Sequence, residues 1–333
     1  MSIHDPLVSV VTPVYNGEKY LSECIESVLT QTHQNWEYVI VNNCSTDRSL
    51  EIARAFENKD RRIRVLSNSK HVSVIENYNI ALSHISRRSK YCKVVSADDW
   101  IYPECLSKMV KLAEAHPSVG IVGSYQMSGD EVKWKGLPCD IDVIVGRDVC
   151  RASFLDKLLV SGNQTSSLYV SDLVLKNIPF FPHLLPYADT SAFFKYLQYY
   201  DYGFVHEILS MERIHHEQVS TKAHDLGMGS IASLDILLQY GPLYLSETEL
   251  EMLRDNILKE HWRWLGGCLL KLCDAEFWKF QASMLKELGH PLPWSKVIKG
   301  AANEMIDEMH NPKVALNKLL FVLKNKFSKK RTI

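Results

Sequence analysis

The sequence predicts an α/β fold, with a mostly parallel sheet flanked by helices and a helical extension towards the C-terminal end. Three observations predict it. Short apolar runs rich in β-branched residues alternate with amphipathic segments over the first 125 residues. Such alternation is typical of right-handed strand–helix–strand units, which build parallel sheets. From about residue 222 the apolar spacing is helical throughout. We therefore expect a domain over residues 1–220 and a helical region over residues 221–333.

The elements follow from the local spacing of apolar residues. Strands are expected at residues 7–12, 36–42, 63–67, 91–96 and 119–125, and helices at residues 18–31, 46–56, 74–85 and 103–115. In the first of these helices, Leu21, Ile25 and Val28 share one face. The part from 126 to 220 is expected to mix short strands and helices, with a helix at 189–200 and a strand at 203–211. Further helices are expected at 231–240, 247–265 and 274–287.

Composition argues against several classes of function. The 333 residues are 46% hydrophobic and 23% charged, with a formal net charge of −1, whereas nucleic-acid binders usually carry a basic excess. No stretch approaches the roughly 18 apolar residues of a membrane span, and the first residues do not resemble a secretory signal. We therefore expect a cytoplasmic protein. Its eight scattered cysteines, which include no CxxC pair, are expected to be reduced and mostly buried, with a disulfide framework or a zinc site as the weaker alternative.

Polar residues gather where the predicted strands end. Ligands of open parallel sheets bind outside the carboxyl ends of the strands. The first strand ends in the sequence TPVYNGE, the second in NNCSTD, and the fourth in SADD. The adjacent carboxylates of Asp98 and Asp99 suit a hard cation such as Mg²⁺ or Mn²⁺, which prefers oxygen ligands and shares its remaining positions with phosphate.

These segments also carry a family resemblance. VSVVTPVYNGEKYLSECIESVLTQT, VNNCSTD, ENYNIAL, SADDW and RIHHEQVS resemble, in order, the motifs of family 2 inverting glycosyltransferases of the GT-A fold. The resemblance covers about residues 7–220. It implies transfer of a sugar from a nucleotide-sugar donor, expected to be a UDP-sugar, to a saccharide or lipid-linked saccharide in the synthesis of a bacterial surface glycan. The donor half would be residues 1–125, the acceptor half residues 126–220, and Mn²⁺ or Mg²⁺ would bind the diphosphate.

The resemblance also assigns individual residues. It implies that Pro13, Tyr15 and Glu18 contact the nucleotide, and that Asn42 occupies the place where many members use an aspartate to bind uracil. An asparagine carbonyl still accepts that hydrogen bond, without the assistance of charge. Ser96 is a second departure, because the family's acidic motif often begins with an aspartate there, but Ser96 can still contact the ribose. The resemblance also places Ala97 in the donor site, Asp98 on the metal, Asp99 near the sugar, and His215 near the metal and diphosphate.

Asp189 matches the catalytic base of the family. An inverting transfer is a single in-line displacement, so a carboxylate must accept the proton of the attacking hydroxyl on the face opposite the leaving group. The cation neutralises the departing diphosphate, so no acid need protonate it.

Each assignment has a structural alternative. Asp98 and Asp99 could form a solvated turn, Asp189 could be an ordinary helix N-cap, and His215 could belong to a surface histidine pair with His216. The departures at Asn42 and Ser96 keep open a catalytically inactive module that binds nucleotide sugars. A Rossmann oxidoreductase is disfavoured, because no GxGxxG follows the first strand.

The C-terminal tail is locally basic. Between residues 313 and 331, seven Lys or Arg residues interleave with apolar residues such as Leu316, Leu320 and Phe327. Such a helix could lie on an anionic membrane and attach the protein peripherally to its inner face. The alternative is that its apolar side packs on the domain.

Overall fold

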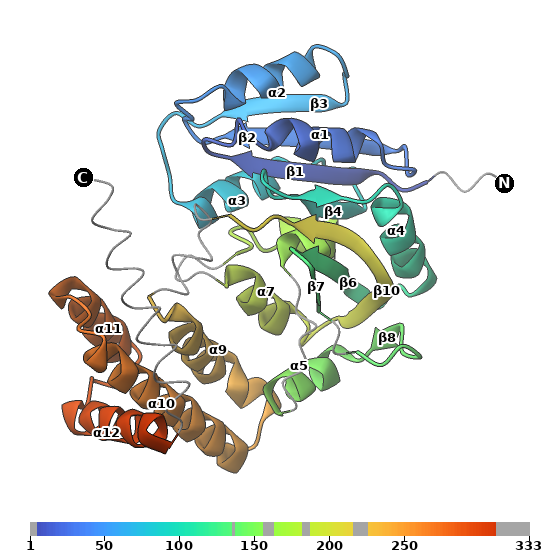
Figure 1. The fold of residues 1–333 in the computed structure, drawn as a ribbon. Helices are drawn as coiled ribbons and strands as arrows, with labels where there is room; N and C mark the ends of the chain where they lie inside the picture. The colour runs from blue at the N-terminus through green and yellow to red at the C-terminus, as the bar shows by residue number, and fades with distance from the viewer. Residues whose placement is uncertain (1–4, 135–136, 156–162, 182–186, 216–225, 311–333) are drawn as a thin grey trace. The chain divides into compact units, whose positions relative to one another are not determined.

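The computed structural model describes residues 5–134, 137–155, 163–181, 187–215 and 226–310 (Figure 1). The chain divides by its internal contacts into two compact units, Met1–Gln218 and Val219–Ile333. The basic tail lies outside the described residues, so membrane contact through residues 311–333 stays a prediction.

The described strands of the first unit join one sheet in the order β3-β2-β1-β4-β9-β6-β10-β5, with β7 paired to β6 and β8 paired to β10. Their bounds are β1 Val8–Val14, β2 Trp36–Asn42, β3 Ile63–Ser67, β4 Tyr91–Val94, β5 Trp100–Ile101, β6 Val119–Ser128, β7 Glu131–Lys133, β8 Val143–Ile144, β9 Leu168–Val170 and β10 Asp201–Glu212. Strands β1 to β4 are parallel to one another, as are β6 and β10. The mostly parallel α/β fold is therefore confirmed.

One strand departs from the expected pattern. The short strand β9, which was not predicted, runs antiparallel between β4 and β6, so β4 and β6 do not pair directly. Three residues are too few to show a period-two pattern. The polypeptide that leads into β9 is thereby brought beside the end of β4.

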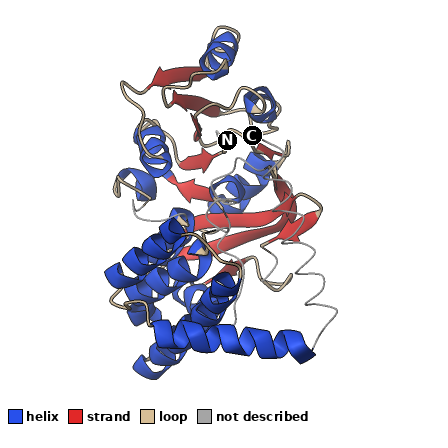
Figure 2. Cartoon of the chain, turned by 60° about the vertical axis from the view of Figure 1, so that its left-hand side comes forward, coloured by secondary structure: helices blue, strands red, loops and turns tan. Residues whose placement is uncertain are grey.

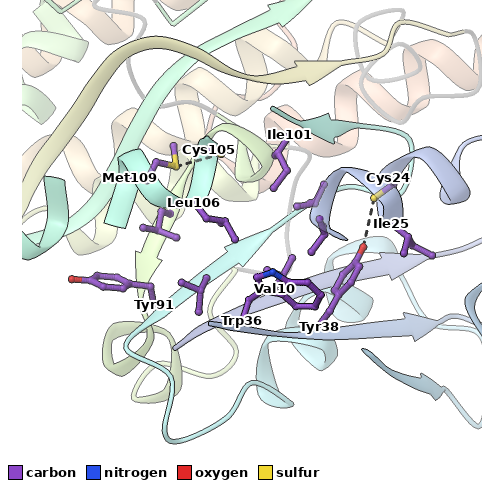
Figure 3. Close-up of a cluster of buried hydrophobic side chains, with 14 of the residues drawn as sticks. Val10, Cys24, Ile25, Trp36, Tyr38, Tyr91, Ile101, Cys105, Leu106 and Met109 are labelled. Carbon is purple, nitrogen blue, oxygen red and sulfur yellow. Dashed lines mark hydrogen bonds between the residues drawn. The ribbon is translucent and has the colours of Figure 1, made fainter. Parts of the chain in front are cut away.

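Helices cover both faces of the parallel strands. Their bounds are α1 Leu21–Leu29, α2 Ser49–Glu57, α3 Val74–Ser83, α4 Cys105–Ala115, α5 Gly146–Leu155, α6 Ser171–Leu175 and α7 Ala188–Tyr196, with a 3-10 turn, η1, at Gln164–Ser166. Helices α1 and α4 share one buried cluster with alternate residues of β1 and β2, such as Val10 and Tyr38 (Figure 3). Val11 and Val39 alternate to the opposite face, where α3 packs on β1 and β2.

The cysteines behave as expected from the sequence. All eight are free, and five of them are buried. In the core shown in Figure 3, the Cys24 Sγ lies 3.7 Å from the Tyr38 hydroxyl and the Cys105 Sγ lies 3.8 Å from the Met109 sulfur. Burial raises the pKa of the Cys24 thiol to about 12. Such a thiol is a small apolar core group rather than a reactive one.

The described part of the second unit is entirely helical (Figure 2). It comprises α9 Met228–Tyr244, α10 Glu247–Leu270, α11 Ala275–Glu287 and α12 Trp294–His310. A capping box between Ser246 and Glu249 starts α10. Helix α12 was not expected from the sequence. No helix in the described ranges is long and apolar enough to cross a membrane.

A buried polar chain links three segments of this unit. The Ser230 hydroxyl lies 2.6 Å from His261 Nδ1, and His261 Nε2 lies 3.1 Å from Gln281 Oε1. Gln281 donates its amide N–H to the Leu226 carbonyl at 2.6 Å. Burial lowers the pKa of His261 to about 4, so the imidazole is neutral in the fold.

Candidate active site

The loops that follow β1 and β2 hold each other in place. The Asn16 backbone N–H donates to Ser45 Oγ at 3.0 Å, and the Asn16 side-chain oxygen accepts from the Thr46 N–H at 2.8 Å. The Gly17 N–H donates to Ser49 Oγ at 2.7 Å. The small polar residues of the second loop therefore brace the first loop, as turn and cap residues do.

Glu18 takes part in the same bracing. Its carboxylate accepts from the Arg48 N–H at 2.9 Å, and its own N–H donates to Asp47 Oδ2 at 2.9 Å. This links Glu18 to the second loop through backbone contacts. The expected contact of Glu18 with a nucleotide stays a prediction.

The three other residues that the resemblance implies for nucleotide contact lie along this edge. Pro13 is buried in β1 opposite Val41. Tyr15 is exposed, and its ring lies edge-on to His71 with the centroids 4.6 Å apart. Asn42 ends β2 and is buried, and its side-chain oxygen accepts from the Ser45 N–H at 3.2 Å. An amide oxygen has two lone pairs, so one acceptor position of Asn42 remains for a base.

The acidic segment after β4 forms a tight turn. The Asp99 N–H donates to the Ser96 carbonyl at 3.0 Å. Gly17 approaches this turn closely, because a Cβ on Gly17 would lie 3.6 Å from the Ala97 Cβ and 2.9 Å from Val14 Cγ2. The first loop and the acidic turn therefore share one edge of the sheet.

Strand pairing then brings the end of β10 to the acidic turn. Strand β5, directly after Asp99, pairs antiparallel with β10 so that Trp100 lies opposite Met211. The residues that follow β10 consequently reach Asp98. His215 Nε2 lies 3.0 Å from Asp98 Oδ2, with the Asp98 and His215 side chains 32% and 18% exposed. Two residues separated by 117 positions in the chain are thus neighbours, and one of them still faces solvent.

Arg213 fixes the backbone of this arrangement. Its N–H donates to Asp99 Oδ1 at 3.2 Å and its Nε–H donates to the Asp98 carbonyl at 3.2 Å. Its guanidinium lies over the rings of Tyr20 and Trp100, at 4.5 and 4.8 Å from their centroids, and pairs with Glu23. Arg213 lies in the RIHHEQVS motif, but no role was predicted for it from the sequence.

Asp99 is buried beside this pair. Thr165 Oγ1–H donates to Asp99 Oδ2 at 3.0 Å. Burial and then the neighbouring charge of Asp98 hold the pKa of Asp99 well above its usual range, although its hydrogen bonds with Arg213 and Thr165 oppose the shift. A carboxyl in this setting is stabilised in its charged form by any added positive charge.

Ser96 belongs to a hydroxyl network that the sequence did not reveal. Its Oγ lies 3.0 Å from the Tyr78 hydroxyl and 3.2 Å from Thr165 Oγ1. The Gln164 amide donates to the Tyr78 hydroxyl at 3.1 Å. Tyr78 lies within the ENYNIAL motif, whereas Gln164 and Thr165 lie in a segment whose pattern carries little chemical information.

Asp189 is the second residue of α7. The N-cap of this helix is Tyr187, with a φ of 93° and no side-chain cap bond, so the interpretation of Asp189 as the N-cap was wrong. The Asp189 carboxylate accepts from the Thr190 N–H at 2.8 Å. Burial raises the pKa of Asp189 to about 6, and the charge of Glu212 adds to the rise. Glu212 also raises the pKa of Asp99.

The site fits a cation that is shared with a substrate. Asp98 and His215 offer a carboxylate oxygen and an imidazole nitrogen next to each other. In the residues that the structure describes, no group of three or more His, Cys, Asp or Glu side chains could hold a metal ion alone. Phosphate and water oxygens would complete the coordination, as is common for Mg²⁺ and Mn²⁺. His216 lies outside the described residues.

Sequence comparisons find relatives of the first part of the chain. Residues 9–149 match the model of glycosyl transferase family 2. Glycosyltransferase GlyG of Streptococcus pneumoniae is 34% identical over 119 residues, which are 36% of this chain and 39% of the relative. The putative teichuronic acid biosynthesis glycosyltransferase TuaG of Bacillus subtilis is 36% identical over 106 residues, 32% of this chain and 41% of the relative. The chain thus spans about two fifths of the length of these relatives.

Structure comparisons extend over more of the chain. The crystal structure of S. aureus TarS 1-349 in complex with UDP-GlcNAc has a TM-score of 0.62 at 19% identity, and the match covers 84% of this chain and 80% of TarS. A mannosyltransferase from Pyrobaculum calidifontis, in complex with GDP-Man and Mn²⁺, has a TM-score of 0.56 at 15% identity. That match covers 99% of this chain and 88% of the mannosyltransferase chain. These likenesses confirm the GT-A fold. The matched segment and the ordered motifs assign residues 9–149 to glycosyl transferase family 2.

Proposed function

We propose that this chain transfers a sugar from a nucleotide-sugar donor to an acceptor hydroxyl, with inversion and with the help of Mn²⁺ or Mg²⁺. The observation that carries the proposal is the contact of 3.0 Å between Asp98 and His215, at the sheet edge that also holds Asp99. A cation there would offset the negative charge of a diphosphate.

The relatives suggest the substrates to test. TarS binds UDP-GlcNAc and the Pyrobaculum enzyme binds GDP-Man with Mn²⁺, so UDP-sugars are the first choice of donor and GDP-mannose the second. TuaG supports a role in bacterial surface polysaccharide synthesis, with a saccharide or lipid-linked saccharide as acceptor.

The proposed metal ligands and the proposed base have different roles in the reaction. Asp98 and His215 would hold the cation, which neutralises the diphosphate as it leaves. Asp189 would accept the proton of the acceptor hydroxyl while the new bond to the anomeric carbon forms and the bond to the phosphate oxygen breaks. A pKa of about 6 leaves this carboxylate mostly ionised at neutral pH yet basic enough to accept a proton.

Titration calorimetry with the Asp98→Ala variant tests the cation site. We expect wild-type protein to bind UDP-GlcNAc or GDP-mannose more tightly in Mn²⁺ than in EDTA, and the variant to lose this difference. Asp172→Ala is the matched control, because Asp172 is an exposed surface carboxylate paired with Lys176 in the same unit. Equal affinity of the wild-type protein in Mn²⁺ and in EDTA would remove the assignment. Tight donor binding with no turnover over a panel of acceptors would instead favour an inactive binding module.

A further inference from the structure

Strand β4 contains a lysine that has no exposed surface. Lys93 is fully buried three positions before Ser96. Its amine donates to the carbonyls of Thr165 at 2.5 Å and Ser167 at 3.1 Å, and lies 3.8 Å from the sulfur of Met109. Burial lowers the pKa of Lys93. Burial of an amine destabilises a fold unless its N–H groups donate hydrogen bonds, so these two carbonyl contacts offset the cost of burying Lys93.

The carbonyls that Lys93 binds belong to the segment Asn163–Ser167, just before β9. Lys93 pairs across the sheet with Leu168, the first residue of β9. Sheet pairing fixes the chain from Leu168 onward, whereas the preceding turn depends on side chains. The Lys93 amine reaches back across the sheet to that turn and fixes two of its carbonyls.

The same turn makes direct contacts with the proposed site. The Thr165 hydroxyl donates to Asp99 Oδ2 at 3.0 Å and lies 3.2 Å from Ser96 Oγ. The Ser96 N–H donates to Thr165 Oγ1 at 3.2 Å. Thr165 itself has no exposed surface. The buried Thr165 hydroxyl therefore holds one oxygen of the Asp99 carboxylate, while the Arg213 N–H binds the other.

We propose that Lys93 is a positioning residue, which fixes the turn at Gln164–Ser167 so that the Thr165 hydroxyl holds Asp99 towards the donor sugar. The inference rests on the proposed function and deepens it, because it adds Thr165 and Lys93 to the residues on which sugar transfer depends. Lys93 acts only through Thr165. Its removal should therefore resemble removal of the Thr165 hydroxyl.

Hydrogen exchange tests the first step without any donor. We expect Lys93→Met to increase amide exchange in peptides covering residues 163–168 and 96–99, compared with wild-type protein. Ser89→Ala is the matched control, since it removes a buried hydrogen bond of 2.9 Å between Ser89 and Ser171 at the other end of the β4–β9 pair. Unchanged exchange in both peptides of the Lys93→Met variant, or an equal increase in the Ser89→Ala variant, would overturn the proposal.

Transfer kinetics test the second step. With a nucleotide sugar that the wild-type chain turns over, chosen from UDP-GlcNAc and GDP-mannose, Thr165→Val should lower kcat/KM by about tenfold or more, the effect of a lost hydrogen bond to a charged group. Thr165→Ser should restore most of it. The double variant Lys93→Met/Thr165→Val should be within about twofold of the slower single variant, because the two changes remove one interaction.

The outcomes separate this inference from the proposed function. Absence of turnover by wild-type protein contradicts the function, while the exchange experiment still decides the positioning step. Fully additive effects of Lys93→Met and Thr165→Val on kcat/KM would show that Lys93 acts independently of Thr165, and would overturn the proposal. If Lys93→Met fails to fold, normal transfer by Thr165→Val overturns the proposal, since the held hydroxyl would then have no role.

Discussion

At the scale of single residues, Asp189 shows a conflict between stability and chemistry. An ordinary aspartate ionises near pH 3.8, whereas burial raises the pKa of Asp189 to about 6. The folded state therefore binds this proton more tightly than the unfolded state does. Protonation of Asp189 therefore adds to the free energy of unfolding at pH values below about 3.8, and this contribution is lost as the pH rises to 6. At neutral pH the fold keeps an ionised, poorly solvated carboxylate.

Replacing Asp189 by asparagine should therefore separate the two effects. We expect transfer to fall by about 10²–10⁴-fold, the range for loss of a general base, with donor affinity nearly unchanged. Stability at pH 7.5 should rise by on the order of 1–3 kcal/mol, and the gain should disappear near pH 4. Wild-type transfer should decline as pH falls below about 6, the pKa of Asp189.

Single-turnover kinetics and thermal melts over this pH range measure both effects. Asp201→Asn is the control, because Asp201 opens β10 opposite Val119, at the far end of the strand from Glu212. Transfer within a few-fold of wild type under conditions where chemistry limits the rate would assign the base to another carboxylate, and Glu212 would be next to test.

His261 gives a second, independent dependence on pH. The unfolded chain takes up a proton near pH 6.5, whereas burial lowers the pKa of this imidazole to about 4 in the fold. Stability should fall as pH drops from about 6.5 to 4, by an amount on the order of 3 kcal/mol. His261→Gln should be less stable than wild type at pH 7 but should lack this loss. Urea unfolding at several pH values measures the stability of both proteins. If stability fell with pH by the same amount in wild type and in His261→Gln, His261 would not be the group responsible.

At the scale of elements, the sequence predicted the regular βα units and missed the connections that complete the site. The strand at residues 36–42 has the expected bounds, because its run WEYVIVN is mostly aromatic or β-branched. Strands β5 and β9, of two and three residues, carry no period, yet β5 brings Arg213 and His215 to Asp98 and β9 anchors the turn with Thr165. Motif order identified Asp98 and His215, but no local pattern identifies a hydroxyl such as that of Thr165.

Arg213 provides the test at this scale. Arg213→Lys keeps the charge but loses the planar stacking on Tyr20 and Trp100 and the geometry that reaches the Asp98 carbonyl. We expect Mn²⁺-dependent donor affinity to fall by about tenfold, consistent with the loss of one or two charge-assisted hydrogen bonds. Calorimetry in Mn²⁺ measures this, with Arg254→Lys in the second unit as control. An unchanged affinity would mean that strand pairing alone holds the acidic turn.

At the scale of the whole molecule, the proposed chemistry lies in one unit. Asp98, Asp99, Asp189 and His215 all belong to Met1–Gln218. We therefore expect a fragment of residues 1–218 to bind the donor with Mn²⁺ within about tenfold of the full chain, as measured by calorimetry. The same fragment carrying Asp98→Ala is the control for specific binding. A folded fragment that does not bind a donor bound by the full chain would assign part of the donor site to the second unit.

The contact between Asp98 and His215 also has a consequence for how the protein is made. The two residues are 117 positions apart in the chain, and the segment that matches the family model ends at residue 149. During synthesis on the ribosome, a nascent chain that has just passed residue 149 has the loops proposed to bind the nucleotide but neither Asp189 nor His215. His215 is added only near the end of the first unit. A chain that stops before residue 189 therefore lacks both the proposed base, Asp189, and one of the proposed metal ligands, His215. Under the proposed function, the chain would therefore become able to use a nucleotide sugar only when nearly the whole unit has been synthesised, so unfinished copies would not consume activated sugars.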